Sequence, residues 1–224
     1  QFVKELGHAF RHIGFVGIVN HGIPRDMVKA FYAQAKQFFS LPVEVKRKYE
    51  VPGLAGQRGY TSFGKEHAKQ SRVADLKEFY QIGQEVDDSD PIKSEYPDNV
   101  MTQDCSEFTK IGNQLYRSFE RSGAYLLQAI ALDLGLDVDY FEAKIHHGNS
   151  ILRAIHYPPI IQEPDSAIRS EQHEDINLIT LLVGASAGGL QVLTKDNQWL
   201  DVVTAEDEIV VNVGDMLQRL TNNV

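Results

Sequence analysis

The change in sequence pattern near residue 150 constrains the fold of this chain more than any other feature. Beyond it, short β-prone runs follow one another, separated by glycine, proline and other turn residues. No helical pattern intervenes between the runs, so antiparallel pairing is expected rather than parallel strands joined by crossover helices. The spacing predicts a β-sandwich or barrel, with strands at 151–157, 178–183, 190–194, 199–203 and 209–213.

The first half of the chain is mostly helical in pattern, which makes the expected fold class α+β. An apolar stripe of helical period predicts the longest helix over 103–134, and Gly135 fits its C-terminal stop. The remaining pattern predicts helices over 1–12, 26–39, 43–49 and 138–144, strands over 15–19 and 75–83, a glycine-marked loop over 51–66 and an irregular acidic connector over 86–101.

The composition limits the classes of partner that this chain is expected to bind. The formal net charge of −9 disfavours a broad nucleic-acid-binding surface. The one cysteine, Cys105, cannot form an internal disulfide or a cysteine-rich zinc site, and we expect it to pack without chemistry. No apolar stretch approaches the roughly 18–20 residues that cross a bilayer, and the first residues lack the layout of a signal peptide. We therefore expect a cytoplasmic protein without nucleic-acid or membrane partners.

The run Gln172-His173-Glu174-Asp175 carries the clearest chemistry. Residues i and i+2 of an extended segment point to the same side, so His173 and Asp175 could offer an imidazole and a carboxylate to one metal ion. Two His and one carboxylate on one face of an ion suit ferrous iron that must also hold substrate and oxygen. Taken alone, such a triplet is more often a solvated turn.

The residues that follow the triplet resemble a known protein family. The segment His173 to Leu182 resembles the iron-binding segment of the isopenicillin N synthase-like branch of the 2-oxoglutarate and Fe(II)-dependent oxygenases. The resemblance covers nearly the whole chain, and the motifs that carry it are collectively specific. The other matching motifs are Gly14-Phe15, Asn20-His21-Gly22-Ile23-Pro24, Phe38-Phe39, Leu41-Pro42, Gly189 to Val192, Trp199, Val202, Val211 to Asp215 and Leu220 to Asn222.

This resemblance implies a double-stranded β-helix, or jelly roll, flanked by helices, with Fe(II) as cofactor and 2-oxoglutarate as cosubstrate. It also implies an N-terminal helical and mixed region over 1–100 and a supporting helix with the iron-binding core over 101–224. Tyr157, just before Pro158, would help to hold the distal carboxylate of 2-oxoglutarate. Arg153 lies an even number of positions earlier and would share its face; a surface ion pair is the alternative for Arg153.

Three further sets of residues have side chains that could serve in binding or metal ligation. In the related branch an Arg placed like Arg58 binds a substrate carboxylate, so Arg58 and Tyr60 are candidate substrate residues, although a solvent-exposed Arg58 is the more common situation. His21 is expected to be structural. The neighbours His146 and His147 would point apart on a strand, so they are assigned no role.

The family pattern also requires a second His ligand and an Arg-x-Ser downstream of the triplet, and no His follows His173. We expect the C-terminal strands of the jelly roll to be missing from this sequence; the alternative is a naturally short, inactive protein. The predicted function is oxidation of a small organic molecule (hydroxylation, desaturation or cyclisation) with O2 and 2-oxoglutarate. An oxidase that needs no 2-oxoglutarate and a non-catalytic binding module are the rivals.

Overall fold

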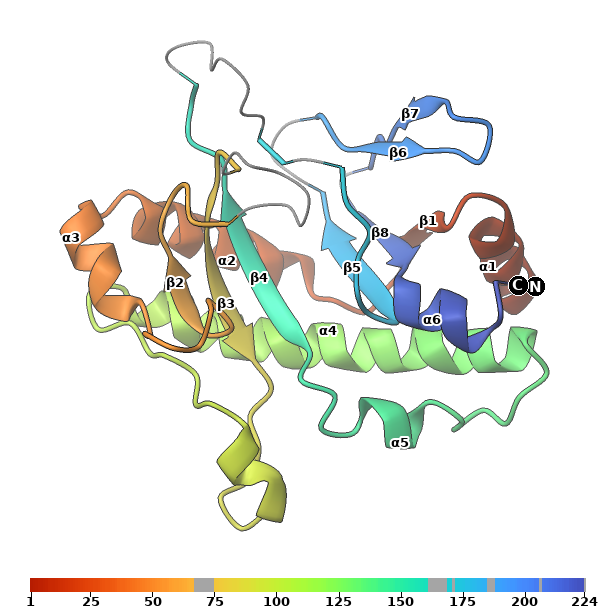
Figure 1. Cartoon of the computed structure of the whole chain (residues 1–224), viewed down its shortest axis with the longest axis horizontal. Coiled ribbons are helices and arrows are strands. Elements are labelled where there is room, and N and C mark those ends of the chain that lie inside the picture. Colours follow the sequence, from red (N-terminus) through yellow and green to blue (C-terminus); the bar gives the residue numbers. More distant parts are fainter. Residues whose placement is uncertain (67–74, 161–168, 171, 185–187, 206, 224) are drawn as a thin grey trace. The chain divides into compact units, whose positions relative to one another are not determined.

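The computed structural model describes residues 1–66, 75–160, 169–170, 172–184, 188–205 and 207–223. Within this part of the chain, most helices lie before residue 146 and short antiparallel strands dominate after it, as the sequence predicts (Figure 1). Two compact units can be distinguished, and each is assembled from separate stretches of sequence. Unit 1 comprises Gln1–Ile23, Phe119–Lys144 and Glu174–Val224; unit 2 comprises Pro24–Ser118 and Ile145–His173.

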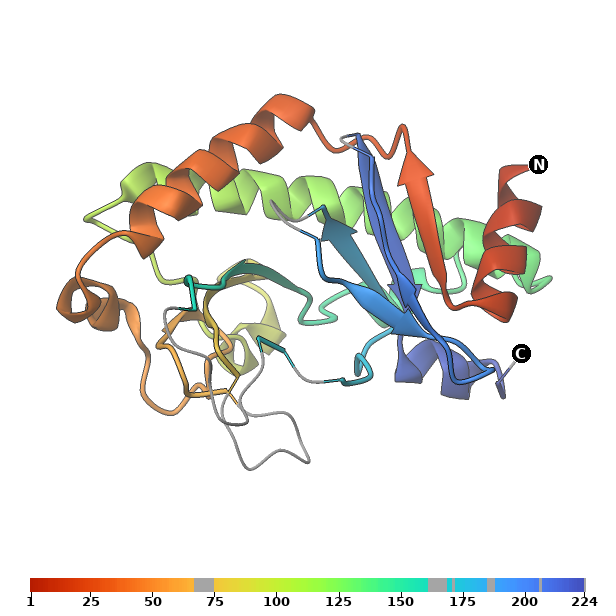
Figure 2. The ribbon, with the colours of Figure 1, turned by 90° about the horizontal axis from the view of Figure 1, so that it is seen from above.

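The main sheet of unit 1 has three antiparallel strands in the order β1-β8-β5 (Figure 2). They are β1 (Phe15–Val19), β8 (Glu208–Val213) and β5 (Ile179–Val183). The central strand β8 is buried on both faces, with Val211 fully enclosed, which is why it is a nearly continuous apolar run. The short strands β6 (Gln191–Leu193) and β7 (Trp199–Asp201) form a separate hairpin.

Helix α1 (Phe2–His12) docks in unit 1 against the C-terminal part of α4 (Ser106–Asp133). A Cβ atom at Gly7 would lie 2.1 Å from the Asp133 carboxyl group, so only glycine allows this approach. Arg11 donates to the same Asp133, with Nη2 3.2 Å from Oδ1. The last helix of the unit among the described residues is α6 (Asp215–Leu220), which the sequence pattern did not predict.

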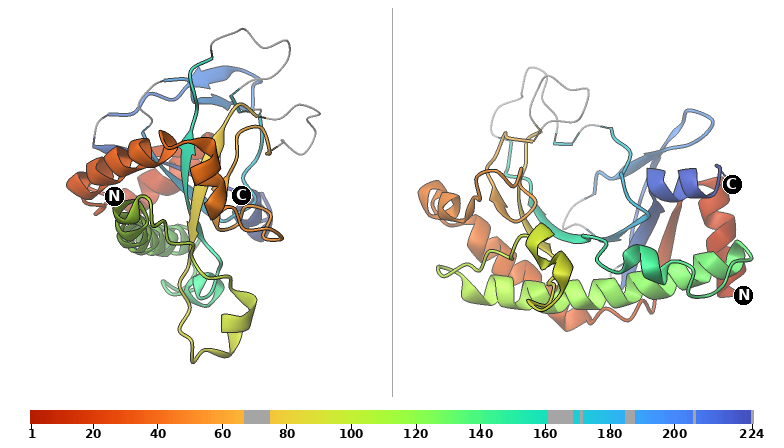
Figure 3. Two further views of the ribbon diagram at one scale, coloured as in Figure 1. Left: turned by 90° about the vertical axis from the view of Figure 1, so that its left-hand side faces the viewer. Right: turned by 60° about the horizontal axis from the view of Figure 1, so that its bottom comes forward.

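Unit 2 is built on the antiparallel sheet β2-β3-β4, which Figure 3 shows from two further directions. Its strands are β2 (Gly59–Thr61), β3 (Glu78–Gly83) and β4 (Ile151–His156). The glycine-marked loop expected over 51–66 therefore contains a strand. Gly59 takes φ +75, and a Cβ there would lie 2.3 Å from the Tyr49 carbonyl oxygen; this explains why a residue that normally weakens strands starts one here.

Unit 2 also contains helices and 3-10 turns. They are α2 (Arg25–Phe39), α3 (Val43–Lys46), the 3-10 turns η1 (Arg47–Tyr49) and η2 (Pro91–Glu95), and the first part of α4. Phe38 of α2 lies at the centre of an aromatic core, 4.9 Å from Phe108 and 5.1 Å from Tyr80 between ring centroids. This apolar contact gives the sheet a covered face and an opposite face. The short helix α5 (Glu142–Ile145) leads into β4.

Candidate functional site

The carboxylate of Asp175 is held by side chains from two strands of unit 1. Thr180 on β5 donates its hydroxyl to Asp175 Oδ2 at 2.6 Å. Asn212 on β8 donates its amide to the same oxygen at 2.9 Å, and Asn177 donates in turn to Thr180 Oγ1 at 2.8 Å. These bonds fix the rotation of the carboxylate about its own axis, as outer-shell donors do for carboxylates that bind metal ions.

The backbone around Asp175 is also held in place, by hydrogen bonds from the start of α6. Asp215 N donates to the carbonyl oxygen of Asp175 at 2.9 Å, and Met216 N donates to that of Asn177 at 3.0 Å. Between them, a Cβ at Gly214 would lie 2.6 Å from the carbonyl oxygen of Asp175. These hydrogen bonds, called the clasp below, join the start of α6 to the 175–178 segment. Only glycine at 214 permits so close an approach.

His173 lies at the end of the range assigned to unit 2, and its side chain is exposed. It belongs to a stretch, 172–175, that has no helix or strand, so the turn alternative applies here and the i, i+2 spacing remains. An imidazole and an oriented carboxylate are the donor types that ferrous iron takes in proteins. The residues present fit iron, and the joint ligation by His173 and Asp175 stays a prediction.

Thr180 and Asn212 were not singled out from the sequence. Asn212 interrupts the apolar run of β8 and is 9% exposed, and a buried polar residue needs a hydrogen-bond partner. This polar interruption of an apolar run could have identified Asn212 as a candidate from the sequence. Thr180 could not have been identified in this way, because threonine is an ordinary strand residue.

The two residues predicted to hold 2-oxoglutarate both belong to unit 2. Arg153 is on β4, and Tyr157 follows the strand and is half-buried. Arg153 donates to Glu66 at 3.1 Å, and its guanidinium carbon lies 4.5 Å from the centroid of the Phe79 ring. The ion-pair alternative for Arg153 is therefore observed, and its contact with cosubstrate stays a prediction.

Strand register shows which residues share the face of Arg153. Arg153 pairs with Gln81, and Gln81 pairs with Gly59. Phe79 likewise pairs with Thr61, so Thr61, Phe79, Gln81 and Arg153 project to the same side of the sheet. Within the described residues, Gln81 Oε1 and Thr61 Oγ1 are buried without a hydrogen-bond partner. This face, unlike the aromatic face, offers unsatisfied polar atoms.

Arg58 is not solvent-exposed, so that expectation was wrong: its side chain is completely buried. Its Nη1 donates to the Gln57 carbonyl oxygen at 2.8 Å, and Nη2 donates to Asn149 Oδ1 at 3.0 Å. A Cβ at Gly83 would lie 1.8 Å from the guanidinium carbon, so Arg58 fits only because residue 83 is glycine. Burial lowers the pKa of Arg58, and the nearby Tyr116 and Tyr96 partly offset that effect.

Tyr60, the other candidate substrate residue, is 2% exposed and donates its hydroxyl to Glu78. Glu78 also accepts from Lys46 Nζ at 2.7 Å and lies 2.8 Å from His156 Nδ1. Burial raises the pKa of Tyr60, and the Glu78 carboxylate raises it further. The burial of Arg58 and Tyr60 favours a structural role, and a substrate contact for either residue has no support in this geometry.

The expected structural role of His21 agrees with its contacts in unit 1. Its Nδ1 accepts from Ile23 N at 3.1 Å, and its carbonyl oxygen accepts from Ser122 Oγ at 2.7 Å. The turn at 20–23 is held by these bonds. In the described part of the chain, no helix is both long and apolar enough to cross a membrane.

Comparison with known protein families accounts for most of the chain. Residues 1–104 match the family described as "non-haem dioxygenase in morphine synthesis N-terminal", and residues 148–224 match the 2OG-Fe(II) oxygenase superfamily. These matches leave the expected division at residue 100 as a prediction, because the two compact units do not follow it.

Individual relatives agree with the family matches. The proline hydroxylase buaE of Petromyces alliaceus is 35% identical over 99% of this chain and 71% of its own length. The 2-oxoglutarate-dependent dioxygenase htyE of Aspergillus rugulosus is 31% identical over 99% of this chain and 70% of its own length.

Solved structures show the same relationship. A protein assigned to the 2OG-Fe(II) oxygenase family from Caulobacter crescentus has a TM-score of 0.89 and 40% identity, covering 99% of this chain and 72% of its own. A full-length Neurospora crassa protein, solved in complex with alpha-KG, has a TM-score of 0.85 and 30% identity, covering 99% of this chain and 69% of its own.

The relatives named for their chemistry act with 2-oxoglutarate and Fe(II), which supports the 2-oxoglutarate-dependent function over an oxidase without that cosubstrate and over a non-catalytic module. The predicted jelly-roll fold and the α+β class are confirmed by the structural neighbours. This chain belongs to the 2-oxoglutarate and Fe(II)-dependent oxygenase superfamily and is a dioxygenase that oxidises a small organic molecule with O2.

Proposed function

We propose that His173 and Asp175 supply two ligands to the iron of this dioxygenase, and that Thr180 and Asn212 are positioning residues for Asp175. The observation that carries the proposal is the pair of side-chain hydrogen bonds to Asp175 Oδ2, 2.6 Å from Thr180 and 2.9 Å from Asn212. Two neutral donors on one oxygen hold the carboxylate in a single rotamer without neutralising its charge.

Bound Fe(II) supplies the activation of O2, which is coupled to oxidative decarboxylation of 2-oxoglutarate to succinate and CO2. The chain contributes orientation. The clasp between 175–178 and the start of α6 keeps the backbone of Asp175 fixed, so little rearrangement is needed when the metal binds. A preorganised ligand loses less entropy on binding than a mobile one.

We further propose that the polar face of the unit 2 sheet receives 2-oxoglutarate or substrate. Arg153 offers a guanidinium for a carboxylate, although it must exchange its bond to Glu66, and Tyr157 offers a phenolic donor. The unsatisfied Gln81 Oε1 and Thr61 Oγ1 lie on this face with Arg153. A polar ligand would satisfy atoms that are otherwise buried without partners.

Two relatives suggest where to begin the search for substrate. One is named a proline hydroxylase, and the Neurospora crassa protein has also been solved with alpha-KG and thymine. A panel of free cyclic amino acids and pyrimidine bases is therefore the first choice, with 2-oxoglutarate turnover to succinate as the readout. The expected absence of nucleic-acid partners and the expected cytoplasmic location stay predictions.

The test is anaerobic titration of the full-length protein with Fe(II), followed by addition of 2-oxoglutarate. A weak visible charge-transfer band should appear in the wild type and be lost in His173→Ala and in Asp175→Ala. Because loss of an outer-shell partner typically costs about 10-fold to 100-fold in metal affinity, Thr180→Val should weaken iron binding by that much.

The matched control is Thr194→Val, the same substitution at the end of the β6–β7 hairpin, where the hydroxyl contacts only Gln198 in the described part of the chain. It should leave iron binding unchanged. Wild-type affinity in both His173→Ala and Asp175→Ala would show that the ligands are elsewhere. Wild-type affinity in Thr180→Val alone would refute the positioning role and leave the ligand assignment intact.

A further inference from the structure

A second group of potential metal ligands lies in unit 2, on residues that the dioxygenase site does not use. One ligand atom each from Asp90, His146 and His147 lies within 4.8 Å of the others, and among the described residues this is the one such group. His147 Nε2 is 3.2 Å from Asp90 Oδ2, and the two imidazole rings are 3.8 Å apart between centroids.

The expectation that His146 and His147 point apart was wrong, because it assumed a strand. Both residues lie in the turn after α5, and His147 adopts the left-handed conformation with φ +53. This conformation is uncommon for a residue with a side chain. The carbonyl oxygen of His147 accepts from the Tyr96 hydroxyl, which holds the turn against the end of η2. The two rings are tilted by 37° to each other and lie close together instead of pointing apart.

Asp90 is presented to these rings by the cap of η2. Its Oδ1 accepts from Ile92 N at 3.0 Å, as an N-cap side chain does. The other oxygen, Oδ2, is the one that faces His147. The cap bond fixes the carboxylate while directing a lone-pair-bearing oxygen toward two imidazoles.

The geometry points to a binding site for a divalent ion of the zinc class, formed by Asp90, His146 and His147 and independent of His173 and Asp175. Two nitrogens and one carboxylate oxygen are donors that Zn²⁺ accepts. With bonds of about 2.0–2.1 Å, two tetrahedral ligands lie roughly 3.3 Å apart. The 3.2 Å between His147 Nε2 and Asp90 Oδ2 already matches that edge. His146 is exposed, so water can complete the shell.

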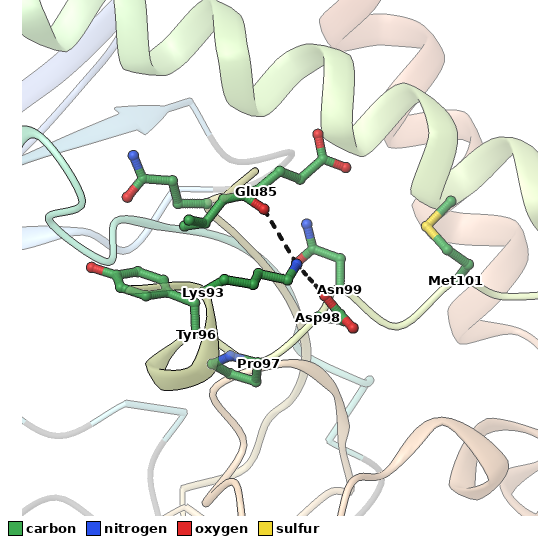
Figure 4. Close-up of a pocket in the computed structure, with 9 residues that line it drawn as sticks. Glu85, Lys93, Tyr96, Pro97, Asp98, Asn99 and Met101 are labelled. Atoms are coloured by element: carbon green, nitrogen blue, oxygen red, sulfur yellow. Dashed lines mark hydrogen bonds and ion pairs between the residues drawn. The ribbon is translucent and has the colours of Figure 1, made fainter. Parts of the chain in front are cut away.

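The positive charge of Lys93, three residues after Asp90, does not oppose a cation there. Lys93 lines a pocket of about 350 Å³ with Tyr96, Pro97 and Asn99. Its ammonium group lies 2.7 Å from Asp98 Oδ1 (Figure 4) and 3.4 Å from Asp88 Oδ1, and it also donates to the Val86 carbonyl oxygen. The charge of Lys93 is thus already compensated by two carboxylates.

A bound ion would join two segments that are distant in sequence. The 86–99 excursion leaves the sheet after β3, and the 146–149 turn enters β4. Both also contact each other through Tyr96 and His147. Because a preformed site does not persist in the unfolded chain, the free energy of metal binding adds to the stability of the fold.

The experiment is isothermal titration of the full-length protein with Zn²⁺, in a His173→Ala/Asp175→Ala background so that the dioxygenase site does not contribute. We expect one ion per chain. His146→Ala and Asp90→Asn should each weaken binding at least about 10-fold, since loss of an outer-shell partner alone costs that much. Asn keeps the cap acceptor of Asp90, so its effect reports the lost charge and not an unfolded cap.

The chain provides a matched control in His8 and His12, which form another close imidazole pair, 3.9 Å between centroids, without a third ligand in the described residues. His8→Ala should bind zinc as the background does. Zinc should also raise the Tm of the background but not of His146→Ala. No zinc binding by the background protein, or unchanged affinity in both His146→Ala and Asp90→Asn, would overturn the proposal.

Discussion

Replacing Lys46 by Met tests the buried ion pair that anchors the unit 2 sheet. The side chains of Lys46 and Glu78 are each 5% exposed, and Lys46 Nζ lies 2.7 and 2.9 Å from the two Glu78 oxygens. Nζ also donates to the Phe39 carbonyl oxygen at 3.0 Å. The substitution keeps the length of the side chain but leaves a buried carboxylate without its cation.

Breaking a buried ion pair by removing one partner costs about 3–5 kcal/mol. Tyr60 and His156 still contact Glu78 in the variant, so we expect the lower end, about 3 kcal/mol. For a chain of this size that corresponds to a fall in Tm of roughly 6–12 °C. Urea unfolding followed by circular dichroism measures the loss as a lower midpoint at an unchanged slope.

The matched control is Lys65→Met, because Lys65 makes the same type of bond to Glu50 at 2.8 Å but is 55% exposed. Exposed pairs contribute about 0–1 kcal/mol. The double variant Lys46→Met/Glu78→Gln removes the stranded charge and should recover about 2 kcal/mol of the loss. A cost below about 1 kcal/mol for Lys46→Met, or no recovery in the double variant, would refute the reasoning.

The same pair predicts a pH dependence. Burial raises the pKa of Glu78, but the hydrogen bonds from Lys46, Tyr60 and His156 lower it more, and it lies below its ordinary value of 4.5. A carboxyl group with a lowered folded pKa stabilises the fold above the unfolded value and loses that contribution as pH falls through the folded one. The stability that this carboxylate gives the wild type should therefore be full above pH 4.5 and be lost as pH falls through the lowered folded pKa. Without Lys46, burial makes Glu78 take up a proton more readily, so the stability gap between wild type and Lys46→Met should shrink as pH falls.

Two further predictions follow from close packing. Gly214→Ala places a Cβ 2.6 Å from the Asp175 carbonyl oxygen, so it should lower the free energy of unfolding by about 1–3 kcal/mol and weaken iron binding. Urea unfolding and Fe(II) titration measure these two effects, and wild-type values in both would contradict the clasp. Cys105 is 6% exposed with a pKa raised by burial, so a disulfide reagent should label it at least about tenfold more slowly in the native than in the urea-unfolded protein; equal rates would contradict its burial.

Much of the local structure could be predicted from the sequence, because local periodicity reports it. The apolar runs gave β1 at its observed bounds and α4 within three residues at its start. The strand β2 was not predicted, because Gly59 lowers strand propensity and only its contact with the Tyr49 carbonyl explains it. Helix α6 is too short to show a clear helical period.

The candidate site shows the same difference between features set by local sequence and features set by tertiary contacts. His173 and Asp175 were predicted because their residue types and their spacing are visible within a short stretch of sequence. The support from Asn212 depends on pairing between β5 and β8, and the Lys46–Glu78 pair joins a helix to a strand. Such contacts depend on tertiary packing, which one sequence without pairing information does not specify. The close approach of the His146 and His147 rings occurs in a turn where His147 is left-handed, which the sequence pattern did not predict.

The strand order β1-β8-β5 has a consequence for biosynthesis. Phe15 of β1 pairs with Asn212 of β8, which lies far along the sequence. During translation β1 emerges long before β8 and has no partner strand until β8 has left the ribosome. The sheet β2-β3-β4 needs only residues up to His156 and can form earlier. The nascent chain therefore carries an unpaired β-strand edge until β8 is made, and such an edge is a site where aggregation can start.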